Sequence, residues 1–275
     1  MRTLSKAFLA GLLACMLLLS GCNAASGLTV VFPKLGSADG ALLMTDRATV
    51  LIDTGEKNDG DELLELLQSY GRDSIDLLVI SHYDKDHVGG AAEIISGCTV
   101  KRVIGSTSPR DSDEMTAYYT ALEHAGLTED IPASPLDLTV EDICLTIDPP
   151  KKSTYESDQS NNSSTVVTVR YQDTQLLFTG DAMAERTAEV SSGLKAKSFD
   201  LIKIPHHGRD AETVSELLPA MRSGAVAVIT SSKKEPEAQA VLDELEHGGI
   251  TPYLTRQGTV VATSDGKTVK ISQEA

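Results

Sequence analysis

A short stretch rich in acidic and imidazole side chains constrains this chain more than any other feature. Residues 82 to 90 read His-Tyr-Asp-Lys-Asp-His-Val-Gly-Gly and follow a largely apolar run, 75–81, which predicts a buried strand. A loop at the end of such a strand can turn His82, Asp84, Asp86 and His87 inward, with the two glycines letting the backbone pass close behind. Imidazole and carboxylate are ligands for Zn²⁺, Mn²⁺ or Fe. Because the chain holds only 6 histidines, this spacing favours a metal site over a polar surface loop.

Apolar runs and helical periodicity alternate along the rest of the chain. Helices are predicted over 61–70, 91–95, 112–126 and 237–247. Strands are predicted over 28–32, 41–44, 48–52, 75–81, 100–104, 140–147, 165–171, 175–179, 200–204, 225–230, 259–262 and 269–271. Strands and helices alternate in two successive halves, and each half contains hairpins. We therefore expect an α/β sandwich with mixed sheets inside and helices outside.

The first motif resembles the His-x-His-x-Asp-His motif of the metallo-β-lactamase superfamily, with Asp84 in place of the second histidine. Further family elements follow in the expected order: Asp53-Thr54-Gly55, Gly180-Asp181 and His206-His207-Gly208. The resemblance implies the αββα sandwich over 28–275 and two divalent metal ions, expected to be Zn²⁺ with Mn²⁺ or Fe as alternatives. It also implies that Asp53 supports the metal loop from behind the ligands.

The resemblance assigns one metal position to Asp86, His87, Asp181 and one histidine of the pair 206–207. We favour His207 as this ligand. His206 then lies beside the metals as a catalytic residue, able to contact a phosphate oxygen or to protonate a leaving group. The reverse assignment of the two histidines stays open. Asp86 is expected to be essential for catalysis as well as for metal binding.

The other metal position is expected to use His82, Asp84 and Asp181, and here the chain departs from the family pattern. No histidine stands at the third-His position of the family. The segment 158–164 there contains Asn161 and Asn162 and resembles the Asn-Asn-x-Ser element of the ComEC-like branch, the metallo-hydrolase domain attached to DNA-uptake channels in competence proteins. This resemblance implies Asn161 or Asn162 as a weaker ligand; an ordinary turn is the alternative.

Two metal ions that activate a water imply hydrolysis of an ester, most naturally a phosphodiester. The leading hypothesis is a surface-anchored phosphodiesterase or nuclease-like hydrolase. One alternative is a phosphorylcholine-type esterase acting on cell-wall or lipid headgroups, because its His-x-Asp-x-Asp-His pattern is similar. Another, of a different class, is a non-catalytic metal-binding surface module. A β-lactamase proper is not expected, since the second and third histidines of that group are absent.

The first residues indicate export and lipidation. Arg2 and Lys6 precede an apolar run, 7–19, that is too short to span a bilayer comfortably. The run ends in Leu-Ser-Gly-Cys at 19–22, which resembles the bacterial lipobox. We expect a signal peptide over 1–21, a lipidated Cys22 with a short tether over 22–27, and a location on the extracellular face of a bacterial membrane. An uncleaved signal anchor is the alternative.

Charge and cysteine content limit the partners. The net charge of −16 and the lack of Lys/Arg runs argue against tight binding of long nucleic acids, which depends on arrays of cations. We expect a small-molecule, cell-wall or short nucleic-acid substrate, and membrane contact through the lipid anchor only. Beyond the leader, Cys98 and Cys144 are the remaining cysteines. An exported domain could pair them in a disulfide, or they could be free thiols.

Overall fold

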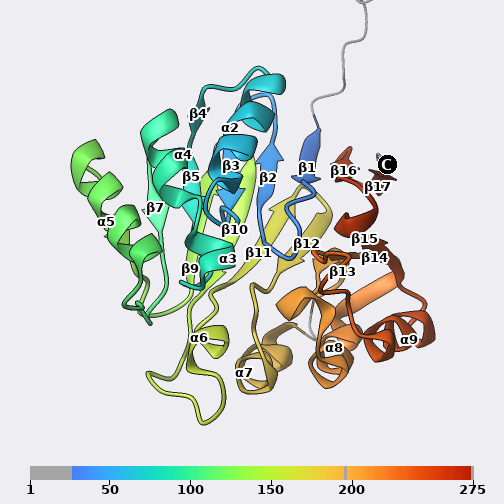
Figure 1. Cartoon of the computed structure of the whole chain (residues 1–275). Helices are drawn as coiled ribbons and strands as arrows, with labels where there is room; N and C mark the ends of the chain where they lie inside the picture. The colour runs from blue at the N-terminus through green and yellow to red at the C-terminus, as the bar shows by residue number, and fades with distance from the viewer. Residues whose placement is uncertain (1–26, 195–196, 274–275) are drawn as a thin grey trace, which may run out of the picture.

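Two large mixed sheets form the centre of the computed structural model, which describes residues 27–194 and 197–273 (Figure 1). The first sheet, in spatial order, contains β17 (Val269–Gln273), β16 (Val260–Ser264), β1 (Leu28–Phe32), β2 (Ala41–Met44), β3 (Thr49–Ile52), β5 (Leu77–Val79), β7 (Val103–Ile104) and β8 (Glu129–Asp130). The second contains β15 (Thr251–Leu254), β14 (Met221–Ile229), β13 (Phe199–Lys203), β12 (Thr174–Phe178), β11 (Val166–Tyr171), β10 (Ile143–Asp148) and β9 (Leu136–Val140). A separate ladder joins β4 (Ser74–Ile75) to β6 (Thr99–Val100).

Helices cover the outer face of each sheet. Those on the first sheet are α2 (Asp59–Ser69), α4 (Ala91–Gly97) and α5 (Asp113–Ala125) (Figure 1). Those on the second sheet are α7 (Ala184–Leu194), α8 (Ala211–Leu217) and α9 (Gln239–His247). Single turns are α3 (Lys85–Val88), α6 (Gln159–Asn162), η1 (Pro205–Gly208), η2 (Leu218–Ala220) and η3 (Thr255–Gln257). The layers therefore follow the predicted αββα order.

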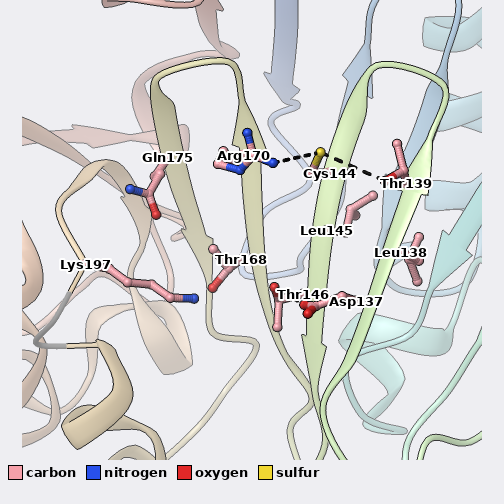
Figure 2. A pocket seen from close by; sticks show the side chains of 10 residues that line it. All are labelled: Asp137, Leu138, Thr139, Cys144, Leu145, Thr146, Thr168, Arg170, Gln175 and Lys197. Atoms are coloured by element: carbon pink, nitrogen blue, oxygen red, sulfur yellow. Dashed lines mark hydrogen bonds between the residues drawn. The ribbon is translucent and has the colours of Figure 1, made fainter.

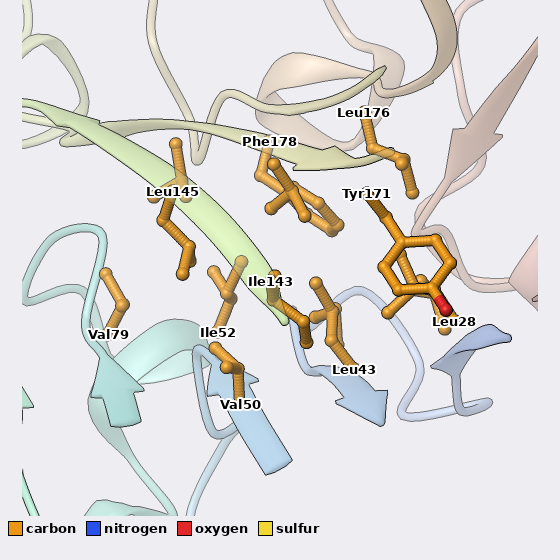
Figure 3. Close-up of a cluster of buried hydrophobic side chains, with 14 of the residues drawn as sticks. Leu28, Leu43, Val50, Ile52, Val79, Ile143, Leu145, Tyr171, Leu176 and Phe178 are labelled. Carbon is orange, nitrogen blue, oxygen red and sulfur yellow. The ribbon is translucent and has the colours of Figure 1, made fainter. Parts of the chain in front are cut away.

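The largest apolar cluster lies between the two sheets. Figure 3 shows Leu43, Val50 and Ile52 of the first sheet facing Ile143 and Leu145 of the second. In β10, residues alternate between this interior and the outer face, as a half-buried strand requires. Each sheet thus buries one face against the other, and burial of apolar side chains at about 25 cal/mol per Å² holds the sandwich together.

The outer face of β9 to β12 is polar and carries a shallow hollow of about 520 Å³ (Figure 2). Here the guanidinium of Arg170 donates to the sulfur of Cys144 over 3.1 Å, and Thr146 donates to Asp137 over 2.7 Å. Cys98 lies elsewhere, at the end of α4, and both cysteines are free thiols. Of the two alternatives left by the sequence, the structure therefore has free thiols rather than a disulfide.

Several elements differ from the sequence prediction. The strand predicted over 140–147 corresponds mainly to β10, because Val140 ends β9 and the chain turns at Glu141 with a left-handed backbone (φ 54°); the rest of β9 was not predicted. The strand predicted over 100–104 is divided between β6 and β7, which pair in different sheets. Helices α7 and α8 and strand β15 were not predicted. The buried side of α7 includes Arg186, Thr187 and Ser191, so the helix carries no continuous apolar period.

The strands that precede the motifs end at one edge of the sandwich. Strands β3 and β5 are parallel neighbours in the first sheet, and β12, β13 and β14 are parallel neighbours in the second. Their carboxyl ends therefore meet at the same edge. The Thr165 backbone N–H, just before β11, donates to the Ser81 carbonyl over 2.8 Å and joins the two sheets there.

The leader prediction lies almost wholly outside the described residues. The signal segment 1–21, Cys22 and the tether up to residue 26 are not described, and description begins at Gly27. Within 27–194 and 197–273, no helix combines the length and apolar character needed to cross a membrane.

Candidate metal centre

The loop after β5 folds as the sequence suggested. His82 follows the strand, and the turn α3 begins after Asp84, which places Asp86 and His87 on one helical turn. The His87 carbonyl accepts from both the backbone N–H and the hydroxyl of Thr54, each over 2.8 Å. A Cβ on Gly90 would stand 2.3 Å from the Thr54 carbonyl oxygen. Glycine is required there because the two loops pass so close together.

Four side chains from distant motifs meet at this edge. Ligand atoms of Asp86, His87, Asp181 and His207 all lie within 4.8 Å of one another. The Nε2 of His207 lies 3.2 Å from an oxygen of Asp86 and 3.2 Å from an oxygen of Asp181. The Nε2 of His87 lies 3.3 Å from the other oxygen of Asp181. Asp181 therefore contacts both imidazoles through separate oxygens.

The opposite nitrogen of each imidazole fixes its ring. The Nδ1 of His87 lies 2.9 Å from Asp53, which also accepts from the backbone N–H and the hydroxyl of Ser81. The Nδ1 of His207 lies 2.9 Å from the Thr230 carbonyl. Such contacts orient metal-binding histidines in proteins. Asp53 thus stands behind the cluster, where the sequence placed it.

The cluster fits divalent cations. The Nε2 atoms of His87 and His207 are buried and have no hydrogen-bond partner among the described residues. A buried polar atom without a partner costs free energy, and a metal ion would satisfy both nitrogens at once. The donor set of two imidazoles and two carboxylates suits Zn²⁺, Mn²⁺ or Fe.

The carboxylates also control the charge of these histidines. Burial lowers the pKa of His207, but the nearby carboxylates of Asp181 and Asp86, each 3.2 Å from its Nε2, outweigh burial and raise this pKa to about 9. Burial likewise opposes the charged form of His87, while Asp181, Asp39 and Asp53 raise its pKa well above the usual value. Protonated imidazoles therefore balance the carboxylates here, and metal cations can take over that role.

The other predicted metal position is looser. His82 is buried, and its Nε2 has no hydrogen-bond partner among the described residues. That nitrogen lies 3.9 Å from one oxygen of Asp84. The second oxygen of Asp84 accepts from Arg110 and from the Ser160 hydroxyl. Asp84 therefore has one oxygen facing His82 and one held by Arg110 and Ser160, which lie at the rim of the site.

The two neighbouring asparagines differ in availability. The Asn161 amide nitrogen donates to Asp158 over 3.0 Å, while its Oδ1 is buried and has no hydrogen-bond partner among the described residues. Both ends of the Asn162 amide have partners: its nitrogen donates to the Ser157 carbonyl over 2.6 Å, and its oxygen accepts from the Arg186 backbone N–H over 3.0 Å. The geometry therefore favours Asn161 as the ligand and gives Asn162 a role in holding the turn α6.

The two adjacent histidines, His206 and His207, occupy different places in the site. His206 and His207 both adopt left-handed conformations, with φ of 47° and 53°. The structure places His207, the favoured ligand, in the cluster. The ring of His206 lies beside it, with Nε2 3.5 Å from the Asn161 amide nitrogen. Burial lowers the pKa of His206 despite the opposing charge of Asp181, so its imidazole is neutral at pH 7.

Sequence reasoning missed Asp39 and Lys203. Both are buried, and the Lys203 ammonium forms an ion pair with Asp39. It also donates to the Gly180 carbonyl over 3.1 Å and lies 3.5 Å from Asp181. The sequence did contain a sign of this ion pair, because Lys203 interrupts the apolar end of a predicted strand directly before the histidine motif. A lysine at such a position indicates a buried partner of opposite charge.

Comparison with known proteins identifies the family of this chain. The family model described as "Metallo-beta-lactamase superfamily" matches residues 40–231. The chain is 27% identical to ComE operon protein 3 of Bacillus subtilis over 289 residues, covering 94% of this chain and 36% of that protein. It is 26% identical to Recombination protein 2 of Haemophilus influenzae over 206 residues, covering 74% of this chain and 24% of that protein. The chain thus spans only about a third of the first relative's length and a quarter of the second's.

Solved structures share the fold. The metallo-β-lactamase fold protein YhfI from Bacillus subtilis has a TM-score of 0.59 at 12% identity, covering 86% of this chain and 100% of that one. An E377D mutant of CmlA β-hydroxylase has a TM-score of 0.53 at 15% identity, covering 99% of this chain and 60% of that one. The likeness at these identities concerns the arrangement of sheets and helices.

Proposed function

This chain belongs to the metallo-β-lactamase superfamily, and from this premise we propose that it hydrolyses phosphodiester bonds with the help of two divalent metal ions. One observation carries the proposal. Two buried imidazoles direct unpartnered Nε2 atoms at Asp86 and Asp181, and a third does so beside Asp84. A divalent metal ion would replace the protons on these imidazoles and bind the same nitrogens and carboxylates.

The proposed ligands divide into two sets that share Asp181. Asp86, His87 and His207 complete the tighter set. His82, Asp84 and Asn161 complete the looser one. Divalent metals, for which Zn²⁺ is proposed with Mn²⁺ or Fe as alternatives, supply Lewis acidity and lower the pKa of water toward neutrality. The chain's part is to fix these ligands, and Asp53 and Thr230 do so through the Nδ1 atoms of two imidazoles.

His206 is proposed to act on the substrate directly. Its ring lies next to Asn161, at the side of the cluster, and is only half buried. Because burial lowers its pKa, the ring is neutral at pH 7. A neutral imidazole carries one N–H, which can donate to a phosphate oxygen. This favours contact with the substrate phosphate over protonation of the leaving group.

The proposed location is the extracellular face of a bacterial membrane, through a lipidated Cys22. The described fold supports an outward-facing site. Strand β1 begins at Leu28 beside Ser264, while its other end, Phe32, leads toward Asp39 and the metal centre. A tether attached at Leu28 thus holds the domain at the end opposite the site. Such a site reaches soluble or cell-wall substrates more readily than headgroups of the same bilayer.

The substrate is proposed to be a small or short phosphodiester. One relative is named a recombination protein, which favours a nucleic-acid phosphodiester. The net charge of −16 opposes tight binding of long nucleic acid, because that depends on many cation–phosphate contacts. A short oligonucleotide or a single phosphodiester is therefore the expected substrate class.

The test is hydrolysis of bis-p-nitrophenyl phosphate by the purified protein after chelation and after reloading with Zn²⁺ or Mn²⁺. We expect turnover only with metal, and its loss in Asp181→Asn. The matched control is Asp137→Asn, which removes a carboxylate on the outer face of β9 (Figure 2) and should leave turnover unchanged. Bound metal without turnover of any phosphodiester would instead indicate a non-catalytic metal-binding module.

A further inference from the structure

The rim of the metal centre carries a cation that the ligand sets do not use. Arg110 belongs to the loop 105–112, between β7 and α5, and its side chain is about half exposed. One terminal nitrogen, Nη1, donates to Asp84 and lies 3.4 Å from the Ser160 hydroxyl. The described contacts of Arg110 all run through Nη1, which leaves Nη2 and Nε as donors.

The loop that carries Arg110 is held in place from the other side of the site. The Gln159 side chain, on α6, donates to the Ser108 hydroxyl over 3.1 Å. The Ser106 hydroxyl donates to the Ser163 carbonyl, just after α6. These contacts join the loop to the turn that contains Asn161. The guanidinium is therefore presented from an anchored segment, although the side chain itself reaches solvent.

Two surface hollows meet at the Asp84–Arg110 pair. One, of about 300 Å³, also includes Asp86 and Ser112. The other, of about 500 Å³, also includes Ser160 and other polar residues of the two loops. Both hollows adjoin proposed metal ligands and are lined mainly by hydroxyl and charged groups. The two hollows therefore offer a polar ester a route to Asp84 and Asp86.

Charge explains why a cation is needed there. Carboxylates line both hollows, among them Asp111, Glu114 and Asp158. An anionic substrate entering past them is repelled. Arg110 is the cation shared by both hollows, and the other, Lys85, lies 3.5 Å from Glu56. A guanidinium presents its donors as a planar fork that matches phosphate oxygens.

We propose that Arg110 binds an anionic oxygen of the substrate phosphate and so sets the preference of this site for phosphoesters over neutral esters. Nη1 stays on Asp84, while Nη2 and Nε donate to the phosphate. This inference rests on the proposed phosphodiesterase function. The competing role is a surface ion pair that only orients Asp84, and such pairs contribute little to the stability of a protein.

The experiment compares the metal-loaded wild type with Arg110→Gln, Arg110→Lys and the control Arg102→Gln. The control removes an exposed guanidinium paired with Asp130 over 2.8 Å, at the start of β7 and away from the site. The measurements are kcat and KM for bis-p-nitrophenyl phosphate, the binding of inorganic phosphate by calorimetry, and metal content. Phosphate binding needs no turnover, so it tests the anion site separately from the activity.

The inference predicts that Arg110→Gln raises KM and weakens phosphate binding, each by about tenfold, because a charge-assisted hydrogen bond is lost. Metal content stays unchanged, Arg110→Lys recovers part of the loss, and Arg102→Gln matches the wild type. Unchanged KM and phosphate binding in Arg110→Gln would overturn the inference while leaving the phosphodiesterase intact. Lower metal content and kcat without weaker phosphate binding would also overturn it, in favour of a role in orienting Asp84. If the wild type showed no turnover but Arg110→Gln still bound phosphate more weakly than the wild type, the anion site would be supported and the proposed activity refuted.

Discussion

Replacement of Lys203 by methionine should destabilise the metal-free protein severely. The Lys203 ammonium is buried between Asp39 and Asp181, and it also donates to the Gly180 carbonyl. Burial lowers the pKa of Lys203, but the two carboxylates raise it above its usual value, so the lysine is charged. Removing one partner of a buried ion pair costs about 3–5 kcal/mol, because the remaining charge is left uncompensated.

The structure identifies which carboxylate is left behind. Asp181 keeps the imidazoles of His87 and His207 as partners. Asp39 is 4% exposed and keeps the Thr230 hydroxyl, which donates over 2.5 Å, but its other cations, the His207 and His87 imidazoles, lie farther away, at 3.6 and 3.7 Å. Asp39 thus loses its closest cation, and most of the cost should come from this carboxylate. Adding Asp39→Asn to Lys203→Met should recover stability, by about 1–3 kcal/mol relative to Lys203→Met alone.

The assay is urea unfolding followed by circular dichroism at pH 7 in the presence of a chelator. Lys101→Met serves as the control, since Lys101 is exposed and paired with Asp76 over 2.7 Å on the surface; it should change stability little. If Lys203→Met were no less stable than this control, or if the double variant were less stable than Lys203→Met, the buried ion pair would not have the role assigned to it.

Three further predictions follow from the described contacts. Asn161→Ala should lower the metal content with little change in the free energy of unfolding. Asn162→Ala should instead lower the free energy of unfolding by about 1–3 kcal/mol, because buried partners lose their hydrogen bonds. Elemental analysis and urea unfolding distinguish the two variants, and equal effects on metal content would contradict the assignment. Burial raises the pKa of Asp59 from 3.8 to about 6, so the wild type loses stability as pH rises from about 4 to about 6, where the folded protein keeps a proton that the unfolded chain has released. Relative to the wild type, Asp59→Asn should therefore gain up to about 1 kcal/mol between about pH 3.5 and pH 6.5, once solvent screening of this half-exposed group is discounted; a melting-temperature difference that does not change with pH would refute it. Peptide mapping without reductant should find Cys98 and Cys144 both unpaired, and a disulfide-linked peptide would contradict the described structure.

The conformation of the loop 82–90 was predictable from the sequence because its signals are local. The apolar run before His82 and the paired glycines after His87 are contiguous, and the structure places them as a strand end and a tight loop contact. The histidine preferred as a ligand, His207, lies in the cluster, and the layered fold follows the predicted order of strands and helices.

Features that depend on contacts between distant segments were not predictable in this way. Asp39 and Lys203 lie far apart in the chain and meet because the two sheets bring the ends of their segments together. Arg110 gains meaning only from its contact with Asp84 across the rim. The predicted strand 140–147 includes only the last residue of β9, and the turn at Glu141 that separates β9 from β10 contains no Gly, Pro or Asn to mark it.

The most direct test of the account is the metal content of the wild type and of Asp86→Ala, measured by elemental analysis together with hydrolysis of bis-p-nitrophenyl phosphate. We expect close to two divalent ions per wild-type chain, with fewer ions and no turnover in the variant, because Asp86 is a proposed ligand in the tighter set. One ion or none in the wild type, with no turnover after addition of Zn²⁺ or Mn²⁺, would contradict the two-metal hydrolase.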